Sequence, residues 1–425
     1  MALALRAYLA ASRLAGMIAP LVLRRRLARG KEDPARLGER LGHAGVPRPN
    51  GDLIWLHGAS VGEAMSMLPL IDALLAARPQ ARVLVTTGTV TSARRLAPLL
   101  PERAVHQFVP VDTAGAVARF LDHWRPDLGI WIESELWPRL VLETARRGVP
   151  MAMVNARISE KSAAGWARVP GMARQVLGAF RLILTQDAPT VERLSAFVDG
   201  AICAGNLKAL VAAEPVADLA AWRAAIDGRP VWLAASTHAG EEEIVLAAHA
   251  MVCRAMPEAL LILAPRHPER GEAVAALCKD AGMEADRRSL DTRVRHGRTL
   301  RGAVLLADTL GEMGLWYSLA PVTFVGGSLV AKGGHTPFEP IAAGSAVLHG
   351  SHVENFAPAY RALGGAEAVR DVSDAGTLAA AVVDLLGNET ARAAMTAQAT
   401  IVHKDIAPDV DRIAERVLAL MESAQ

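Results

Sequence analysis

The chain of 425 residues is long enough for two or three domains of ordinary size. Apolar residues make up 52% of it and charged residues 21%, and these proportions exclude a disordered or low-complexity protein. The three cysteines, Cys203, Cys253 and Cys278, lie far apart without metal-ligand spacing, which excludes a disulfide scaffold and a zinc ribbon.

The net charge of +2 is unevenly distributed along the chain. Residues 1–42 contain nine Lys or Arg and three Asp or Glu, a net charge of +6, which leaves −4 for the remainder. A mildly acidic body provides no basic face for nucleic acid. We therefore expect no nucleic-acid partner.

Residues 1–23 predict a helix with an apolar side, interrupted by Arg6, Arg13 and small polar residues and followed by three consecutive arginines. The side chains expected to share that side are Leu3, Leu5, Leu9, Leu14 and Met17. Basic residues beside such a helix favour an anionic cytoplasmic membrane surface. We expect contact with a membrane surface through residues 1–26. A membrane span, against which Pro20 counts, and a plain core helix stay open as alternatives.

From residue 53 onward, short apolar runs alternate with amphipathic runs, the pattern of βαβ units on a parallel sheet. The alternation breaks over the alanine-rich stretch 209–229 and then restarts. The predicted strands are Leu53–His57, Arg82–Thr87, Val105–Val109, Leu128–Glu133, Met151–Asn155, Leu182–Thr185, Val231–Ala235, Ala259–Ala264, Ala303–Ala307, Val322–Val325 and Ala346–Leu348. The predicted helices include Glu63–Ala77, Ala114–Trp124, Leu136–Arg147, Thr377–Leu386 and Asp409–Ser423.

The predicted fold class is therefore α/β, with two doubly wound, Rossmann-like domains. We expect an N-terminal segment over residues 1–42, a first domain over 43–208, a linker over 209–229 and a second domain over 230–425. The closing helices either stay with the second domain or pack back on the first. Such sheets bind ligands beyond the carboxyl ends of their strands, and two facing domains would place a substrate site in the cleft between them.

Glu63 is the first candidate for chemistry. It follows the strand that ends at His57 and falls in the first turn of the next predicted helix. A carboxylate there can accept a proton from a hydroxyl, as a general base does. An acidic residue in a first helical turn is also favoured by the helix dipole alone, so both roles stay open.

Further candidates lie at two other places in the first domain. Glu133 and Glu135 come directly after an apolar run. Ser134 or Glu135 can instead cap the helix whose first turn holds Pro138. Lys208 lies at the end of the first domain, where its ammonium group can act as a point charge for phosphate or carboxylate.

Several turns of the second domain favour anions. Arg266 follows a predicted strand and can bind phosphate in a bidentate manner. The glycine-rich turns at 326–328 and 333–334 are expected to expose backbone N–H groups to phosphate. Glu339 then begins a helix, where it can hold ribose hydroxyls or act as a cap. The chain contains neither a Rossmann NAD fingerprint nor a P-loop, and no HExxH, so no metal site is expected.

Taken together, these strings resemble one known family. They are HGASVGE (57–63), ESELWP (133–138), NARIS (155–159), GNLK (205–208), ASTHAGEE (235–242), PRHPER (265–270), DTLGEM (308–313), FVGGSLV (324–330), GGHTPFEP (333–340) and the pair Asn355-Phe356. In this order, over roughly residues 30–365, they closely resemble the 3-deoxy-D-manno-octulosonic acid (Kdo) transferases of lipopolysaccharide inner-core synthesis.

The resemblance implies a glycosyltransferase of the GT-B type, with two facing Rossmann-like domains. It implies transfer of Kdo from CMP-Kdo to the 6′-hydroxyl of a tetraacylated lipid A precursor, at the cytoplasmic face of the inner membrane. It further implies inversion of the anomeric configuration, no metal and no cofactor besides the donor substrate.

By motif matching, Glu63 takes the place of the family's catalytic base, and Glu133 and Lys208 take the places of residues that stabilise the transition state. The residues implied to bind the CMP of the donor are Pro265, Arg266, Leu310, Gly311, Glu312, Thr336, Pro337, Phe338 and Glu339. The family usually reads GGHNPLEP, whereas this chain has Thr336 and Phe338 in place of the asparagine and the leucine. Threonine keeps a hydroxyl but lacks the two-donor amide.

Two other classes of function stay open on the same architecture. A nucleotide-sugar epimerase would need no lipid acceptor and would leave the apolar, basic N-terminus unexplained. A non-catalytic sugar-nucleotide binder would have no use for Glu63, yet Glu63 and Arg266 are both present. Replacing Glu63 by alanine separates these cases, because only an enzyme that uses it as a base would lose activity while still binding the donor.

Overall fold

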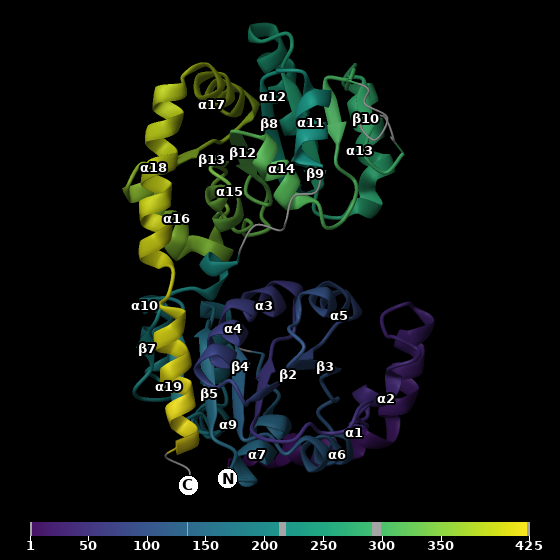
Figure 1. The fold of residues 1–425 in the computed structure, drawn as a ribbon, viewed down its shortest axis with the longest axis vertical. Helices are drawn as coiled ribbons and strands as arrows, with labels where there is room; N and C mark the ends of the chain where they lie inside the picture. Colours follow the sequence, from purple (N-terminus) through teal and green to yellow (C-terminus); the bar gives the residue numbers. More distant parts are fainter. Residues whose placement is uncertain (1, 134, 212–217, 291–298, 423–425) are drawn as a thin grey trace. The chain divides into compact units, whose positions relative to one another are not determined.

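The computed structural model describes residues 2–133, 135–211, 218–290 and 299–422. The described residues form two compact units, one from residues 1–211 and 407–425 and one from residues 212–406 (Figure 1). Each unit holds one seven-stranded sheet in which neighbouring strands run parallel. The predicted α/β class with two Rossmann-like domains is confirmed.

The sheet of the first unit has the strand order β3-β2-β1-β4-β5-β6-β7, so the winding direction reverses between β1 and β4. Its strands are β1 (Leu53–His57), β2 (Arg82–Thr87), β3 (Ala104–Phe108), β4 (Leu128–Ile132), β5 (Met151–Ala156), β6 (Leu182–Thr185) and β7 (Ile202–Cys203). Its helices are α1 (Leu3–Ala28), α2 (Leu37–Arg40), α3 (Val61–Ser66), α4 (Leu68–Ala77), α5 (Val90–Leu96), η1 (Ala97–Leu99), α6 (Ala114–Trp124), α7 (Pro138–Arg146), α8 (Glu160–Ala167), α9 (Pro170–Leu177), α10 (Ala188–Leu194), η2 (Leu207–Leu210) and α19 (Val410–Glu422).

The sheet of the second unit has the order β10-β11-β9-β8-β12-β13-β14, with its reversal between β8 and β12. Its strands are β8 (Val231–Thr237), β9 (Leu260–Pro265), β10 (Ala285–Arg287), β11 (Val304–Leu306), β12 (Val322–Val325), β13 (Ala346–His349) and β14 (Val369–Asp371). Its helices are α11 (Leu219–Ile226), α12 (Glu242–Ala255), η3 (Pro268–Arg270), α13 (Gly271–Asp280), α14 (Met313–Leu319), α15 (Phe338–Ala342), η5 (Glu354–Phe356), α16 (Ala357–Gly365), α17 (Ala375–Gly387) and α18 (Glu389–Ile406).

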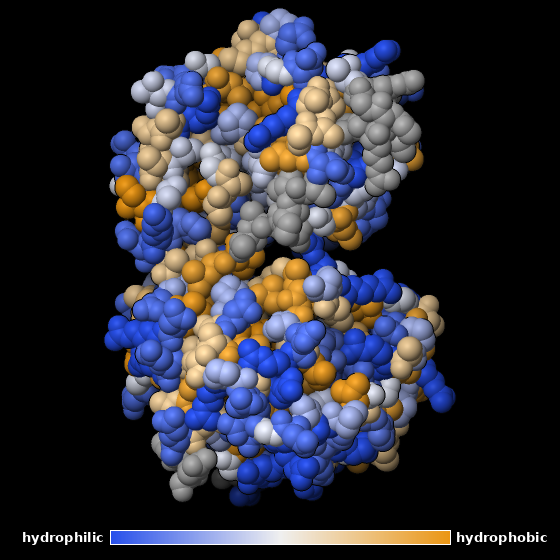
Figure 2. All heavy atoms as spheres, in the orientation of Figure 1, coloured by the Kyte–Doolittle hydropathy of each residue, from blue (hydrophilic) through white to orange (hydrophobic). Residues whose placement is uncertain are grey.

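Both faces of each sheet are covered, which explains why the strands are apolar throughout. In β1, Ile54 packs into the core on one face while Leu53 and Trp55 pack into the core on the other. Alternate residues of a strand point to opposite faces, so a strand buried on both sides has no polar side. On the surface seen in Figure 2, hydrophilic side chains predominate and hydrophobic side chains lie between them.

All the predicted strands are present, but the structure adds elements that the pattern did not indicate. Strands β7, β10 and β14 have only two or three residues each, too few for a recognisable period. The predicted helix Glu63–Ala77 is two helices that meet at Met67, since Pro69 in the first turn of α4 has no N–H to continue the hydrogen bonding of one long helix. Helix α18 was missed altogether, and its sequence is rich in alanine and threonine.

The segment predicted as a linker, 209–229, contains helix α11 of the second unit. Trp222 and Ile226 of this helix are buried in a core cluster that also includes Trp316 of α14. Residues 212–217 of the predicted linker lie outside the described residues. At the other end of the chain, α19 packs alongside α4 of the first unit, as Figure 1 shows.

The prediction that the N-terminal apolar residues share one side of helix α1 is wrong. Leu5 and Leu9 are buried against the first unit, whereas Leu14 and Met17 are 64% and 75% exposed. Leu9 and Leu14 are five residues apart, about 140° around a helix, so they cannot share one side. Helix α1 therefore has a buried face and a separate exposed apolar face. It is the one described helix long and apolar enough to cross a membrane.

Candidate functional site

The first candidate site lies at the reversal point of the first sheet. Glu63 is in the first turn of α3, which follows β1, and Glu133 directly follows β4, the strand beside β1. Lys208 lies in η2, which contacts α3. Ligands of doubly wound sheets bind at this reversal point, beyond the carboxyl ends of the strands. The structure thus brings together three residues that are far apart in the sequence.

Glu63 is a buried carboxylate held by the start of its own helix. The backbone N–H of Ala59 donates to Oε2 at 2.7 Å, and the hydroxyl of Ser60 donates to Oε1 at 2.8 Å. Ser60 Oγ in turn accepts from the Glu63 N–H at 3.3 Å and so caps the start of α3. Glu63 is therefore part of the hydrogen-bonded start of α3, and it is also the carboxylate that the sequence predicts as the base.

The pKa of Glu63 is raised above its ordinary value. Burial is the largest cause and the nearby Glu133 carboxylate is the second, while the hydrogen bonds from Ala59 and Ser60 oppose the shift. Burial and a like charge both disfavour the ionised form. A carboxylate with a raised pKa is a stronger base, which suits proton transfer from a hydroxyl.

Glu133 and Lys208 form an ion pair beside Glu63. Two asparagines that the sequence analysis did not single out as site residues position Lys208. Asn155 Oδ1 accepts from the Leu207 N–H at 3.0 Å, and Asn206 Oδ1 accepts from the Lys208 N–H at 3.0 Å. Both asparagines lie within strings that carried the family resemblance, which was the available signal for them.

The backbone is strained at two of these positions. Glu133 has φ of 60° and Asn155 has φ of 56°, at the carboxyl ends of β4 and β5. A non-glycine residue seldom adopts this left-handed conformation, and such strain is concentrated at functional sites. Glu133 adopts this conformation directly after β4, whereas Asn155 adopts it inside β5, where the pairing with β6 is irregular.

The alternative capping role predicted for Glu135 is wrong. Asp112 accepts hydrogen bonds from the N–H groups of Arg139 and Leu140, at 3.0 and 2.8 Å, and so caps α7. Glu135 instead accepts a hydrogen bond from the Trp137 side chain. Ser134, the other predicted cap, lies outside the described residues.

In the second unit, the residues expected to bind CMP follow three strands at the same edge of the sheet. Pro265 ends β9 and the exposed Arg266 follows it, with its N–H donating to the Thr237 carbonyl. The remaining residues lie after β11 (Leu310, Gly311, Glu312) and before or within α15 (Thr336, Pro337, Phe338, Glu339). Glu312 accepts from Arg288 at 2.6 Å, and Thr336 Oγ1 accepts from the Phe338 N–H at 3.3 Å.

The glycine-rich turn at 326–328 does not offer its N–H groups to a ligand, contrary to the sequence prediction. The carboxylate of Glu241, whose side chain is fully buried, accepts from the N–H groups of Gly327, Ser328 and Leu329 at 2.6–2.9 Å. It also accepts from the His238 N–H at 3.0 Å. An internal carboxylate thus occupies the anion-binding position at the reversal point between β8 and β12.

The second glycine-rich turn, at 333–334, likewise forms hydrogen bonds within the protein. The Gly334 N–H donates to the Gly327 carbonyl, and the side chain of Asn355 donates to the Gly334 carbonyl at 3.3 Å. Beside this turn, the rings of His238 and His335 stack with their Nε2 atoms 2.9 Å apart. Burial, and then Arg266, lower the pKa of His335 to about 4, so this imidazole is neutral near pH 7.

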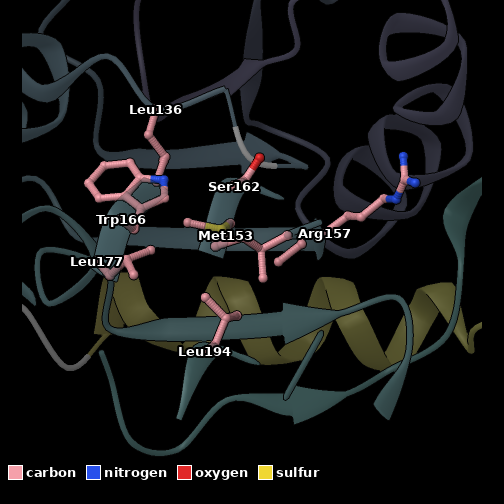
Figure 3. Close-up of a pocket in the computed structure, with 9 residues that line it drawn as sticks. Leu136, Met153, Arg157, Ser162, Trp166, Leu177 and Leu194 are labelled. Carbon is pink, nitrogen blue, oxygen red and sulfur yellow. The ribbon is translucent and has the colours of Figure 1, made fainter. Parts of the chain in front are cut away.

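A small cavity of about 50 Å³ lies next to the Glu133 turn in the first unit (Figure 3). Leu136, Met153, Leu177 and Leu194 line it, while Arg157 extends away from the other labelled side chains. Ser162 and Arg157 make part of its lining polar, and no Asp, Glu, His or Lys side chain is among the residues that line it. Within the described ranges, no group of three or more His, Cys, Asp or Glu side chains could hold a metal ion.

Comparison with known proteins identifies the family. The family model described as 3-deoxy-D-manno-octulosonic-acid transferase (kdotransferase) matches residues 35–211. The chain is 37% identical over 378 residues to the 3-deoxy-D-manno-octulosonic acid transferase of Bordetella pertussis, covering 85% of this chain and 86% of that protein. It is 34% identical to the transferase of the same name from Haemophilus influenzae, covering 84% of each chain.

Among solved structures, a UDP-GlcNAc 2-epimerase from Neisseria meningitidis bound to UDP-GlcNAc matches with a TM-score of 0.61. It covers 87% of this chain and all of that chain at 13% identity, a likeness of fold alone. The sequence relatives, at more than twice that identity, decide the family. The chain belongs to the 3-deoxy-D-manno-octulosonic acid transferases.

Proposed function

We propose that this protein transfers Kdo from CMP-Kdo to the 6′-hydroxyl of a tetraacylated lipid A precursor, with inversion at the anomeric carbon. The observation that carries the proposal is the position of Glu63, buried beside the Glu133–Lys208 ion pair at the reversal point of the first sheet. Membership of the Kdo transferase family supports the sugar that is transferred.

In the proposed reaction, the acceptor hydroxyl oxygen forms a bond to the anomeric carbon of Kdo. The bond between that carbon and the phosphate oxygen breaks, CMP leaves with the electron pair, and the hydroxyl proton passes to a Glu63 oxygen. A hydroxyl is a poor nucleophile until a base takes its proton. Lys208 supplies positive charge near the reacting atoms, and Glu133 and Asn206 hold it in place.

The donor is proposed to bind the second unit through Arg266 and the segments 310–312 and 336–339. A guanidinium group binds a phosphate oxygen pair without help from another ion, and Arg266 is exposed for that purpose. The N–H groups of residues 327–329 already donate to Glu241 and cannot also bind phosphate. Arg266 is therefore proposed to contact the phosphate. We propose that the transfer needs no metal and no cofactor besides the donor.

A transfer assay tests the proposed function. The purified protein is incubated with CMP-Kdo and the tetraacylated precursor in the presence of EDTA, and the lipid product is weighed by mass spectrometry. A product heavier by one or more Kdo units is expected. If CMP-Kdo binds and no Kdo is transferred, the acceptor assignment fails. If CMP-Kdo does not bind, the donor assignment fails as well.

The acid limb of the pH profile depends on Glu63. Because Glu63 must be deprotonated to act as a base, kcat/KM is expected to rise with pH through its raised pKa. Glu133→Gln removes the like charge beside Glu63 and the carboxylate that partly neutralises the Lys208 ammonium group, and both changes favour ionised Glu63. The midpoint of the acid limb is therefore expected to move to lower pH. A midpoint that stays in place or rises contradicts this assignment.

We further propose that α1 holds the protein at the cytoplasmic face of the inner membrane, lying on the surface rather than crossing it. One face of α1 packs against the first unit, where the buried Arg139 donates to Ser12 Oγ and to the Leu9 carbonyl. On the outer face, Leu14, Met17 and Leu21 form an apolar stripe. Arginines and apolar residues on one exposed helix face favour an anionic bilayer surface.

Replacing Leu14, Met17 and Leu21 by glutamine is expected to weaken binding to anionic vesicles by at least about tenfold, because three exposed apolar side chains no longer insert. Glutamine keeps the helix, and the buried face stays intact. The matched control places glutamine at three other exposed apolar positions, Leu99, Met251 and Ile401. Equal vesicle binding by the two triple variants, measured by co-sedimentation, would disprove the role of α1.

A further inference from the structure

A groove of about 460 Å³ runs along helix α1 in the first unit. Its helical side consists of two adjacent rows of α1. One row is Tyr8, Ala11, Ala15, Ile18, Val22 and Arg26, and the other is the buried row Ser12, Ala19 and Leu23. The opposite wall comes from Val111–Thr113 after β3 and from Trp137 before α7. The volume falls within the range of about 300–1,000 Å³ that is usual for small-molecule sites.

The polar groups that line the groove are already paired with one another. The Tyr8 hydroxyl donates to Asp112 at 2.7 Å. At the far end, Arg26 and Arg40 lie 2.5 and 3.5 Å from the buried carboxylate of Glu32. Paired groups of this kind offer little to a polar ligand, whereas the alanines, Ile18 and Val22 offer apolar surface. The groove therefore suits an aliphatic chain.

The groove opens beside the stripe that we propose contacts the bilayer. Ile18 lines the groove and lies one turn beyond Leu14 of the exposed stripe, so the two apolar surfaces adjoin. Positive charge collects at the basic end of the helix, where Arg26 lines the groove and the exposed Arg24 and Arg25 lie next to it. An aliphatic chain attached to an anionic headgroup matches both features.

The groove also adjoins the turn that carries Glu133. Trp137 lines the groove, is 40% exposed, and donates its side-chain hydrogen bond to Glu135. Glu135 interacts electrostatically with Arg40 on one side and with Glu63 on the other. A chain lying in the groove would thus end near the residues proposed to activate the acceptor hydroxyl.

We infer that the groove along α1 binds an acyl chain of the lipid acceptor, an inference that rests on the proposed transfer function. Helix α1 is then part of the acceptor site as well as a membrane contact. The chain enters from the bilayer past Ile18, and the headgroup stays at the edge of the sheet where Glu63 lies. Recognition of the acceptor thereby includes its lipid part.

The test blocks the groove and leaves the outer face of α1 unchanged. Ala15→Phe, and separately Ala11→Phe, fill the groove with an aromatic ring. The matched control is Ala10→Phe, an exposed position of the same helix that does not line the groove. Each variant is assayed with the tetraacylated precursor and with the same headgroup after its acyl chains have been removed, and its binding to vesicles is measured.

Both groove variants are expected to raise the KM for the acylated acceptor by at least about tenfold, with kcat retained. Their kcat/KM for the deacylated headgroup should match the control. Their vesicle binding should match that of the wild-type protein, which is the reference here because Ala10 lies in line with Leu14 and Met17 and its replacement by phenylalanine adds apolar surface to the exposed stripe. An unchanged KM, or an equal change for Ala10→Phe, overturns the inference. Loss of vesicle binding with an unchanged KM also overturns it, because the groove would then hold a bilayer lipid.

A binding measurement separates failure of the inference from failure of the proposed function. An acceptor with brominated acyl chains should quench part of the tryptophan fluorescence, and Trp137→Phe should remove that part. If the wild-type protein binds this acceptor with Trp137 quenched but transfers no Kdo, the proposed function fails and the groove assignment stands. If it transfers Kdo with Trp137 unquenched, the groove assignment fails.

Discussion

Glu63→Gln is expected to lower kcat for Kdo transfer by about 10²–10⁴-fold, the usual contribution of a general base. The amide keeps an oxygen that can accept from Ala59 or Ser60, so the start of α3 should be preserved. The variant loses only the ability to take a proton from the acceptor hydroxyl. Binding of CMP-Kdo, proposed to use the second unit, should stay within about twofold of wild type by calorimetry.

Stability provides the control for this variant. Because burial raises the pKa of Glu63, ionising it costs folding free energy at pH values above its ordinary pKa, and a neutral amide avoids that cost. The thermal midpoint at pH 7 should therefore be unchanged or higher. Glu160→Gln, an exposed carboxylate at the start of α8, should change neither rate nor stability. A Glu63→Gln enzyme with near wild-type kcat contradicts the role of base.

Glu241→Ala is expected to cause the largest loss of stability. It leaves the buried N–H groups of Gly327 and Ser328 without their acceptor, as well as the partly buried N–H groups of Leu329 and His238. Each orphaned donor costs roughly 1–3 kcal/mol, and the costs do not simply add because water can enter the space. We expect a total of at least about 3 kcal/mol, seen as a fall of roughly 6–12 °C in the melting temperature.

The neighbouring residue Glu243 gives a matched control, since it is exposed on the same turn of helix. Glu243→Ala should change the free energy of unfolding by less than about 0.5 kcal/mol. If Glu241→Ala costs less than about 1 kcal/mol in urea denaturation, the carboxylate is not what holds the glycine-rich turn.

Much of the fold could be predicted because the buried parallel strands are short, uninterrupted apolar runs. Runs such as Leu53–His57 and Val322–Val325 match the strands residue for residue. The edge strands β7, β10 and β14 could not be predicted, since two or three residues become a strand only through the neighbour with which they pair. Helix α11 could not be predicted, because Trp222 and Ile226 are its main large buried apolar residues and two such residues do not define a helical period.

The candidate site residues that directly follow strands could be predicted from the sequence. Glu63 and Glu133 both follow central strands, and the parallel topology brings these ends together. What could not be predicted were contacts between distant loops. Asn155 binds a backbone group 52 positions away, and Glu241 reaches the glycine-rich turn from more than 80 positions away. The sequence shows that a glycine-rich turn exists, but only the packing shows what fills it.

The measurement that tests the central claim most directly is the anomeric configuration of the transferred sugar. The product of the transfer assay is isolated, and NMR compares its anomeric carbon with that of CMP-Kdo. One displacement by a hydroxyl activated at Glu63 predicts inverted configuration. Retained configuration would require two successive displacements, and would contradict a mechanism in which Glu63 acts only as the base for the acceptor.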